Sequence, residues 1–456
     1  MSENSLVISR FKKFMNAWLD SYMERLEEPS ISLAMVKDGK VIYKKAVGYS
    51  NLEDKSKAKT TDLYRFASHS KNFTAVAIMQ LVERDLLSLD DKLKKFIDVN
   101  KEDKTFQSIT IRQLLSHQAG VSRDSENSGF WSYQKEFLSK DDLVDLAKNS
   151  KAVIENNTRF KYSNIGYGFL GLVIEKVTGE NYNDYVKSNI IDKIGLKNTE
   201  MDYNPSKENY VTGYTGKLLT GKYELLSAEV LTHGLSPAAG VCSTPEEMAM
   251  FYQNLAMGNK NLVSDSLKKE LFRGVYEISG GTGKYGLGFK EIKLHGSTLV
   301  GHGGLFPGQI SASYFDQESN ISVSVVVSAI DGDPMGPLGT LLSTYKFFEK
   351  HKDELEKTKF KDNQFELYSL WASTRFIIVG DNVYLTSVAY SNPLSDDNCT
   401  ELTINEDNTC KITKASGMGS YGEMINFNFD EDNKVKSALY SGSLMCKKED
   451  FELPKF

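Results

Sequence analysis

The sequence has little of what marks secreted, membrane-spanning or metal-binding proteins. Its 456 residues include nine prolines and four cysteines, and no two cysteines have the CxxC spacing of zinc sites and redox motifs. No apolar run approaches the ~18 residues that a membrane-spanning helix needs. The start Met1-Ser2-Glu3-Asn4 lacks the basic and apolar regions of a secretory signal. We therefore expect a cytoplasmic protein whose cysteines are buried thiols, with a disulfide between two of them as the alternative.

Basic charge is not in excess either. The chain has 55 Lys and Arg against 61 Asp and Glu, a net charge of −6. This balance argues against a nucleic-acid-binding protein, because such proteins present a basic field. The last 94 residues alone contain 14 acidic and 8 basic side chains, so residues 1–362 are neutral overall. The change in charge is a first indication of a domain boundary.

Several catalytic motifs are missing. The chain has no GxSxG, which excludes the nucleophile elbow of the α/β-hydrolases, and no GxxxxGK[ST] loop for nucleotide phosphates. The six histidines are scattered and form no ligand set with the cysteines. We expect no metal, no cofactor, and no nucleic-acid or membrane partner.

Hydrophobic patterning predicts a large α/β domain in residues 1–362. Residues 30–36 and 41–48 have the pattern of two strands joined by an Asp38-Gly39 turn. A helix-rich stretch follows from about 68 to 260, and alternating strands return near 298–330. Strands at both ends of a helical region predict a mixed sheet with a helical insertion.

The remaining residues, 363–456, have a different pattern. About eight short alternating segments follow one another with turn residues between them. Strands of this length and spacing predict a small all-β antiparallel barrel or sandwich.

Ser68-His69-Ser70-Lys71 has the SxxK spacing, which places a hydroxyl and an amine on one face of a helix start. A lysine whose pKa is lowered from ~10.4 can take the proton of the hydroxyl and make it a nucleophile. The spacing alone is weak, because five other Ser and Lys pairs share it. By itself the segment would be interpreted as an ordinary helix start.

Two further motifs lie at a distance in the chain. Tyr162-Ser163-Asn164 is a YxN motif in a loop before a helix, where a phenol can relay a proton and an amide can orient a base. His302-Gly303-Gly304 is the one HxG of the chain, and its glycines can bring backbone N–H groups close to an oxyanion. Taken singly, the first would be interpreted as a polar loop with a packed tyrosine and the second as a glycine-rich turn.

Taken together, the order and context of the three motifs resemble a known superfamily. Residues from about 30 to 350 look like the serine β-lactamase and penicillin-binding-protein superfamily, nearest its class C, esterase and D-aminopeptidase branch. The resemblance extends to the opening hairpin at Ser32–Val41, to Thr110–Gly120 and to Pro237–Glu247. It implies the fold of that superfamily for the first domain.

The resemblance implies a role for each motif residue. Ser68 would be the acylated nucleophile and Lys71 its activating base. Tyr162 would share the proton traffic and protonate the leaving group, and Asn164 would contact the lysine or a substrate amide. His302 stands where β-lactamases and many transpeptidases have the lysine of Lys-Thr-Gly.

The histidine is a departure that resembles the D-aminopeptidases. A histidine is mostly neutral at pH 7, so His302 would attract a substrate carboxylate less than a lysine would. Gly303 and Gly304 would let the backbone approach the substrate, and the N–H groups of Ser68 and Leu305 would form the oxyanion hole. His69 would either line the cleft or face solvent.

The implied function is a serine hydrolase that acts through an acyl-enzyme on short peptides or amides, as a D-aminopeptidase-like peptidase. A carboxylesterase of the same type and a catalytically silent scaffold that binds a partner are the alternatives. D-aminopeptidases carry lipocalin-like barrels after the catalytic domain, and 94 residues leave room for one barrel. Archaeal serine peptidases with one barrel assemble as oligomers, which implies a homo-oligomer; whether the barrel would cap its own or a neighbouring active site stays open.

Overall fold

The structure is a computed structural model that describes residues 3–227, 229–278, 280, 283–357, 360–407, 409–415 and 420–453. It contains two compact units, of which one is Glu28–Met335 and the other joins Met1–Glu27 with Gly336–Phe456. The division that the sequence predicts between residues 362 and 363 stays a prediction.

The unit Glu28–Met335 is built on a sheet in which nine strands of the described residues follow the order β3-β2-β1-β13-β12-β11-β10-β9-β8. These strands are β1 Ser30–Lys37, β2 Lys40–Asn51, β3 Ser56–Lys57, β8 Tyr276–Glu277, β9 Lys284–Tyr285, β10 Lys290–Leu294, β11 Ser297–Phe306, β12 Gln309–Asp316 and β13 Ile321–Val327. Strand β1 lies between β2 and β13, with Leu33 opposite Val325. Distant segments therefore close the sheet, as the sequence predicts.

Strand direction differs from the prediction of a mixed sheet. All strand pairs described in this sheet are antiparallel. Hairpins join β1 to β2 and β11 to β12, and β13 returns beside β1 in the opposite direction. Antiparallel neighbours need only short connections, so no helical crossover is required within the sheet.

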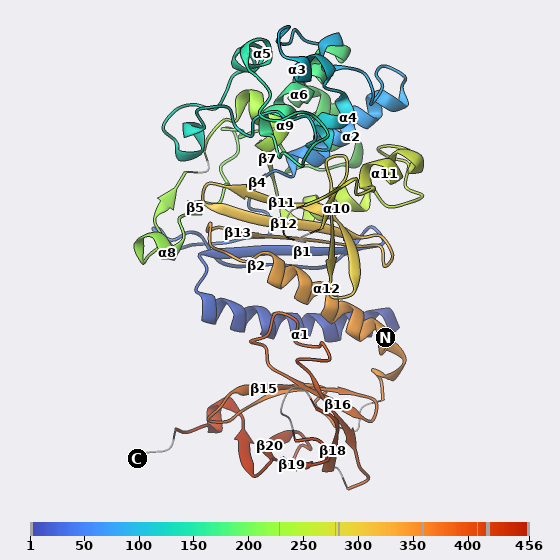
Figure 1. The fold of residues 1–456 in the computed structure, drawn as a ribbon. Coiled ribbons are helices and arrows are strands. Elements are labelled where there is room, and N and C mark those ends of the chain that lie inside the picture. Colours follow the sequence, from blue (N-terminus) through green and yellow to red (C-terminus); the bar gives the residue numbers. More distant parts are fainter. Residues whose placement is uncertain are drawn as a thin grey trace. The chain divides into compact units, whose positions relative to one another are not determined.

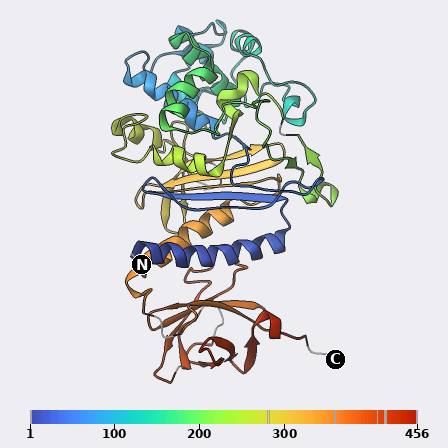
Figure 2. The same cartoon turned by 180° about the vertical axis from the view of Figure 1, so that it is seen from behind.

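The helical insertion lies between the two groups of strands in the chain, as predicted. Its helices are α2 Ser70–Glu83, α3 Lys104–Ser108, α4 Ile111–Leu115, α5 Lys140–Asn149, α6 Asn164–Thr178, α7 Tyr182–Val186, α8 Lys217–Thr220, α9 Ser236–Ala239, α10 Pro245–Gln253 and α11 Asp265–Phe272. Two opposite views show α2, α4, α5, α6 and α9 on one side of the sheet (Figures 1 and 2). Short strand pairs join β4 Tyr64–Ala67 to β7 Val241–Ser243 and β5 Gly213–Tyr214 to β6 Leu225–Leu226.

Helix α2 is buried almost along its whole length, because apolar residues such as Phe73, Val76 and Met79 surround its axis. A helix that is apolar all round is suited to the centre of a core rather than to its surface. Here the core includes Leu114 of α4 and Phe169 of α6. The segment that follows Ser68 is therefore rigidly held by packing.

The second unit contains α1 Glu3–Leu26, α12 Met335–Lys350 and a closed barrel. The barrel strands are β14 Gln364–Tyr368, β15 Ser373–Val379, β16 Asn382–Thr386, β17 Thr400–Ile404, β18 Thr409–Lys414, β19 Met424–Phe429, β20 Val435–Tyr440 and β21 Ser443–Cys446. Buried side chains such as Phe376, Leu402 and Ile412 fill the barrel. The barrel form of the predicted antiparallel domain is thus confirmed.

Helix α1 belongs to this unit through contacts that its sequence position does not reveal. Phe11 packs edge-to-face on Tyr345 of α12 with ring centroids 5.4 Å apart. Arg10 donates a hydrogen bond to the carbonyl oxygen of Leu355 at 2.7 Å, and Trp18 Nε1 donates to the carbonyl oxygen of Tyr390 at 2.8 Å. The apolar stripe of the first helix therefore packs on residues from the other end of the chain.

Two sequence expectations concern features other than the fold. All four cysteines are free thiols, and Cys242, Cys399 and Cys410 are buried, so the disulfide alternative is wrong for this structure. Within the described ranges, no helix has both the length and the apolar character needed to cross a bilayer.

Candidate active site

Ser68 lies in the turn between β4 and α2. The helix begins at Ser70, so Ser68 precedes it rather than occupying its first turn as the SxxK spacing suggested. Ala67 has φ 48°, in the left-handed region that non-glycine residues rarely adopt. The residues on both sides are buried whereas Ser68 is partly exposed. The strained turn thus presents the hydroxyl at the surface of an otherwise packed segment.

Lys71 lies on the first turn of α2 and is completely buried. Its Nζ is 2.8 Å from Asn164 Oδ1, 2.7 Å from the carbonyl oxygen of Ala238 and 3.2 Å from Ser68 Oγ. Burial lowers the pKa of Lys71 well below its ordinary value. A neutral amine has two N–H bonds, which the two carbonyl oxygens accept. Its lone pair is then left for the proton of Ser68.

Tyr162 approaches Ser68 from the loop before α6. Its hydroxyl donates a hydrogen bond to Ser68 Oγ at 2.8 Å. Burial raises the pKa of the Tyr162 phenol above its ordinary value, although the hydrogen bond to Ser68 lowers it in part. The ring packs against that of His117, with centroids 4.3 Å apart and the planes tilted by 36°. A protonated phenol in a fixed position is suited to donating a proton.

Asn164 is the first residue of α6, whose N-terminus is capped by Ser163, because the Gly166 backbone N–H donates a hydrogen bond to Ser163 Oγ. Its Nδ2 donates to Asp124 Oδ1 at 2.7 Å, which leaves Oδ1 turned toward Lys71. Asp124 therefore decides which end of the amide faces the amine. Sequence reasoning missed Asp124, which belongs to none of the three motifs.

Asp124 and Arg123 also act on the amine by charge. Arg123 Nε donates to Asp124 Oδ2 at 3.1 Å. After burial, which lowers the pKa of Lys71 most, Asp124 raises that pKa and Arg123 lowers it. The pair therefore sets how readily Lys71 loses its proton.

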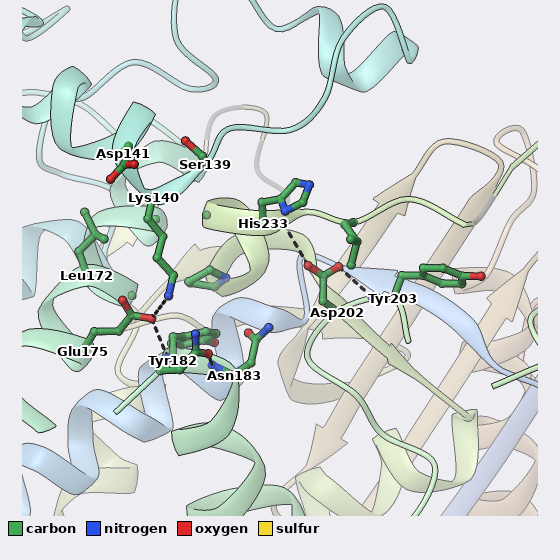
Figure 3. A pocket seen from close by; sticks show the side chains of 16 residues that line it. Ser139, Lys140, Asp141, Leu172, Glu175, Tyr182, Asn183, Asp202, Tyr203 and His233 are labelled. Carbon is green, nitrogen blue, oxygen red and sulfur yellow. Dashed lines mark hydrogen bonds and ion pairs between the residues drawn. The ribbon is translucent and has the colours of Figure 1, made fainter. Parts of the chain in front are cut away.

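The carbonyl oxygen of Ala238 is placed by the loop before α9. Asp202 accepts hydrogen bonds from the backbone N–H groups of Thr232 at 2.9 Å and His233 at 3.1 Å. Figure 3 shows Asp202 beside His233 in a cavity of about 560 Å³ that these residues line together with others from α5 and α6. A Cβ at Gly171 of α6 would lie only 2.4 Å from Pro237 Cγ. The glycine thus lets α9 approach α6 closely. The cavity lies where α5, α6 and the loop before α9 meet.

His302 lies on β11, and both of its ring nitrogens contact protein groups. Nδ1 is 2.6 Å from the carbonyl oxygen of Gly303, which accepts only, so Nδ1 carries the proton. Nε2 then accepts from the hydroxyl of Tyr285 at 2.9 Å. Burial lowers the pKa of His302 well below its ordinary value, and Lys71 lowers it further whenever its amine is charged. His302 is therefore a neutral side chain, and Tyr285 is a partner that no motif indicated.

Strand β11 carries the glycine-rich segment past Ser68. Its described pairing with β10 ends at Gly301, so residues 302–306 pair with β12 alone. A Cβ at Gly304 would lie 2.1 Å from the carbonyl oxygen of Phe66, whereas one at Gly303 would be 3.6 Å from its nearest neighbour. Only glycine at position 304 allows this approach of β11 to the strand before Ser68. Leu305 follows with its side chain exposed.

Two other histidines lie nearby. His69 is fully buried, with its Nδ1 2.8 Å from the carbonyl oxygen of Phe66, so the solvent-facing alternative is wrong. Its ring contacts that of His302 at a centroid distance of 6.1 Å. His117 accepts a hydrogen bond from the Ser163 backbone N–H at 3.1 Å. Both histidines support the site by packing.

Two cavities meet at Ser68, Arg123 and Leu305, which line both. We call the first, of about 740 Å³, the Lys290 lobe; its walls include Tyr162, Lys290, His302 and Tyr314. We call the second, of about 680 Å³, the Trp131 lobe; its walls include Trp131, Leu226, Phe306 and Ile330. The Trp131 lobe has aromatic and aliphatic walls, whereas the Lys290 lobe combines apolar walls with cationic groups.

Metal ligands do not gather in this region. Across the described ranges of the chain, no group of three or more His, Cys, Asp or Glu side chains has an arrangement that would hold a metal ion. The serine, amine and phenol around Ser68 form a set typical of nucleophilic acyl transfer, in which a base activates a hydroxyl and an acid protonates the leaving group.

Comparisons with known proteins show which family the chain resembles over most of its length. The sequence profile of the family described as Beta-lactamase matches residues 15–340. "Penicillin-binding protein 4*" of Bacillus subtilis (strain 168) is 29% identical over 286 residues, which are 59% of this chain and 61% of the relative. The chain thus spans less than two thirds of that relative's length.

Solved structures extend the likeness to the barrel. The octameric penicillin-binding protein homologue from Pyrococcus abyssi has a TM-score of 0.64 at 23% identity and covers 95% of this chain and 99% of its own. A D-stereospecific amidohydrolase from Streptomyces sp. has a TM-score of 0.57 at 25% identity and covers 66% of this chain and 90% of its own. The first of these matches nearly the whole length of both chains.

Proposed function

Because the chain belongs to the β-lactamase family, we propose that it is a serine hydrolase that cleaves short peptides or amides through an acyl-enzyme on Ser68. The observation that carries the proposal is the set of contacts at Ser68 Oγ. This oxygen receives a hydrogen bond from Tyr162 at 2.8 Å and lies 3.2 Å from the buried amine of Lys71. A hydroxyl between a neutral amine and a protonated phenol has both its base and its acid in place.

The proposed acylation begins with proton transfer from Ser68 to Lys71, while Ser68 Oγ attacks the carbonyl carbon of the substrate. The resulting ammonium is stabilised by the carbonyl oxygens of Asn164 and Ala238. The backbone N–H groups of Ser68 and Leu305 would hold the oxyanion. Tyr162 donates its proton to the leaving nitrogen and regains one from Lys71, and water then attacks the acyl-enzyme by the reverse route.

The substrate class follows from His302 and from the Trp131 lobe. His302 is neutral and both ring nitrogens are engaged, so it has no charge to offer a substrate carboxylate beside the scissile bond. An apolar acyl side chain fits the walls formed by Trp131 and Phe306. We propose an amino-terminal residue of the D series, for which the D-stereospecific amidohydrolase among the similar structures is support.

Covalent labelling tests the nucleophile. A fluorophosphonate should phosphonylate the wild-type protein once, and mass spectrometry of the digest should place the adduct on Ser68. The Ser68→Ala variant should remain unlabelled. Labelling that persists in this variant, or no labelling of a folded wild-type protein, would support the silent scaffold instead.

A substrate panel tests the reaction class. D-aminoacyl and L-aminoacyl p-nitroanilides are compared with p-nitrophenyl esters of the same acyl groups. We expect the D-aminoacyl anilides to be cleaved faster than the L forms. Cleavage of esters with no turnover of any anilide would establish the carboxylesterase alternative, and a clear preference for L substrates would remove the D-aminopeptidase assignment.

A homo-oligomer is a further part of the proposal. The similar structure from Pyrococcus abyssi is described as octameric and covers the barrel as well as the hydrolase fold. Light scattering coupled to size-exclusion chromatography should give a mass that is a multiple of 51.1 kDa. A mass of one chain across a range of protein concentrations would exclude the oligomer.

A further inference from the structure

Lys290 is a half-buried cation in the wall of the lobe that contains Ser68 and Tyr162. It is the first residue of β10 and lies opposite Gly301, next to His302 in β11. Its ammonium makes no hydrogen bond or ion pair with any group in the described residues. Burial alone lowers the pKa of Lys290, and no carboxylate raises it again. A cation in this state lacks the counter-ion that a half-buried charge normally has.

The other charged groups of the lobe are already engaged or lie at its rim. Arg123 is paired with Asp124 at 3.1 Å. Asp333 accepts a hydrogen bond from the backbone N–H of Met335 at 2.9 Å. Lys293, on the same strand as Lys290, is exposed. Lys290 is therefore the charge in this lobe that is best placed to bind an anion carried by a substrate.

The two lobes differ in whether the proposed proton donor lines them. Tyr162, the proposed donor to the leaving group, lines the Lys290 lobe, whereas it is absent from the walls of the Trp131 lobe. The leaving group must lie on the side of its proton donor. It follows that the Lys290 lobe receives the leaving group and the Trp131 lobe receives the acyl side chain.

We propose that Lys290 is a specificity-determining residue that binds a free carboxylate on the leaving group. The preferred substrates are then short peptides in which an apolar residue is released from one or two residues with a free carboxyl end. This inference rests on the proposed function, because it uses Tyr162 as the donor to the leaving group. In this proposal the substrate carboxylate is bound by Lys290 on β10, and not by the neutral His302 on β11.

Matched acid and amide substrates test the proposal. D-Phe-Gly and D-Phe-Gly-Gly are compared with the same peptides ending in a carboxamide, and each is also prepared with L-Phe. Wild-type protein should favour the acids in kcat/KM, mainly through KM, by about 10-fold or more, as expected for a charged hydrogen bond. Lys290→Gln should remove this preference, and Lys290→Arg should keep part of it. Lys284→Gln is the control, because Lys284 lies on β9, is exposed and does not line the cleft.

The same peptides are used as competitors of fluorophosphonate labelling, so the answer does not depend on turnover. In the wild-type protein the acids should protect Ser68 at lower concentrations than the amides, and in Lys290→Gln the two should protect equally. Equal protection by acid and amide in the wild-type protein, or a preference that survives Lys290→Gln, overturns the role of Lys290. Ser68 labelling would still be present in that case, whereas failure of the proposed function would abolish the labelling itself.

Discussion

Replacing Asp124 with asparagine should move the pH dependence of acylation to lower pH. The introduced side-chain amide can still accept the hydrogen bond from Asn164 Nδ2, so the orientation of Asn164 is kept while the charge is removed. Burial lowers the pKa of Lys71 most, and Asp124 opposes this by raising it. Without the carboxylate the pKa of Lys71 falls further. Because only the neutral amine accepts the proton of Ser68, the same fraction of active protein is then reached at lower pH.

The size of the effect follows from the path between the two groups. Asp124 Oδ1 is 2.7 Å from Asn164 Nδ2, and Asn164 Oδ1 is 2.8 Å from Lys71 Nζ. The charges are therefore at most about 7–8 Å apart, and at an effective dielectric of ~20 they interact by at least about 2 kcal/mol. That energy corresponds to a change of about 30-fold in the ratio of neutral to charged amine at a given pH. Relaxation of the protein and screening by salt reduce this energy. We therefore expect the midpoint of the pH profile of acylation to move down by about one pH unit.

The assay is the second-order rate constant of fluorophosphonate labelling, measured from pH 5 to 10 in wild type, Asp124→Asn and Arg123→Gln. Arg123 lowers the pKa of Lys71, so its loss should move the midpoint to higher pH. A general loss of structure would not move the pH midpoint down in one variant and up in the other. The reasoning fails if both variants move the midpoint in the same direction, or if the wild-type rate falls as the pH rises through its midpoint.

Three further outcomes are expected. Tyr162→Phe keeps the ring that packs on His117 but removes the donor to Ser68, so turnover should fall about 10²- to 10⁴-fold; wild-type rates in steady-state assays would contradict the role of the phenol. Gly304→Ala brings a Cβ to 2.1 Å from the Phe66 carbonyl oxygen, whereas Gly303→Ala leaves 3.6 Å. Thermal unfolding should therefore show a loss of about 1–3 kcal/mol for the first and little for the second, and equal losses would refute this account. Burial raises the pKa of Glu28 from 4.5 to about 7, so its ionisation destabilises the fold by up to about 3 kcal/mol as the pH rises through this range. Glu28→Gln should raise the melting temperature at pH 8 but not at pH 4; an equal change at both would mean that charge is not the cause.

The architecture was predictable where it depends on local pattern. The Asp38-Gly39 turn between alternating strands indicates a hairpin, and both strands are present as β1 and β2. The short alternating segments after residue 362 likewise predict the barrel strands, because each strand has one face on the barrel core. The pairing of α1 with α12 was not predictable, because Phe11 and Tyr345 are joined only by tertiary contact.

The candidate site was predictable only in its motif residues. The structure joins Tyr162, Ser68, Lys71 and Asn164, in this order, in a chain of hydrogen bonds. The residues that set their charge and orientation, such as Asp124, lie in loops with no characteristic spacing, and their role depends on long-range contact. A polar motif also does not reveal which of its residues are buried, so the sequence left both a cleft-lining and a solvent-facing position open for His69.

The charge pattern around Ser68 explains why a neutral histidine at position 302 does not exclude substrates that carry a carboxylate. Lys71 is buried among carbonyl oxygens and has a lowered pKa, and His302 has no proton to gain while Tyr285 donates to Nε2. Neither group near the scissile bond then carries a permanent charge that would bind a carboxylate and block proton transfer. In our proposal the charge that binds the carboxylate lies instead on the neighbouring strand, at Lys290, which is opposite Gly301. If Lys290 sets the specificity and Asp124 the pH dependence, the two act independently, and substitutions at Lys290 and Asp124 should have additive effects on the free energy of activation.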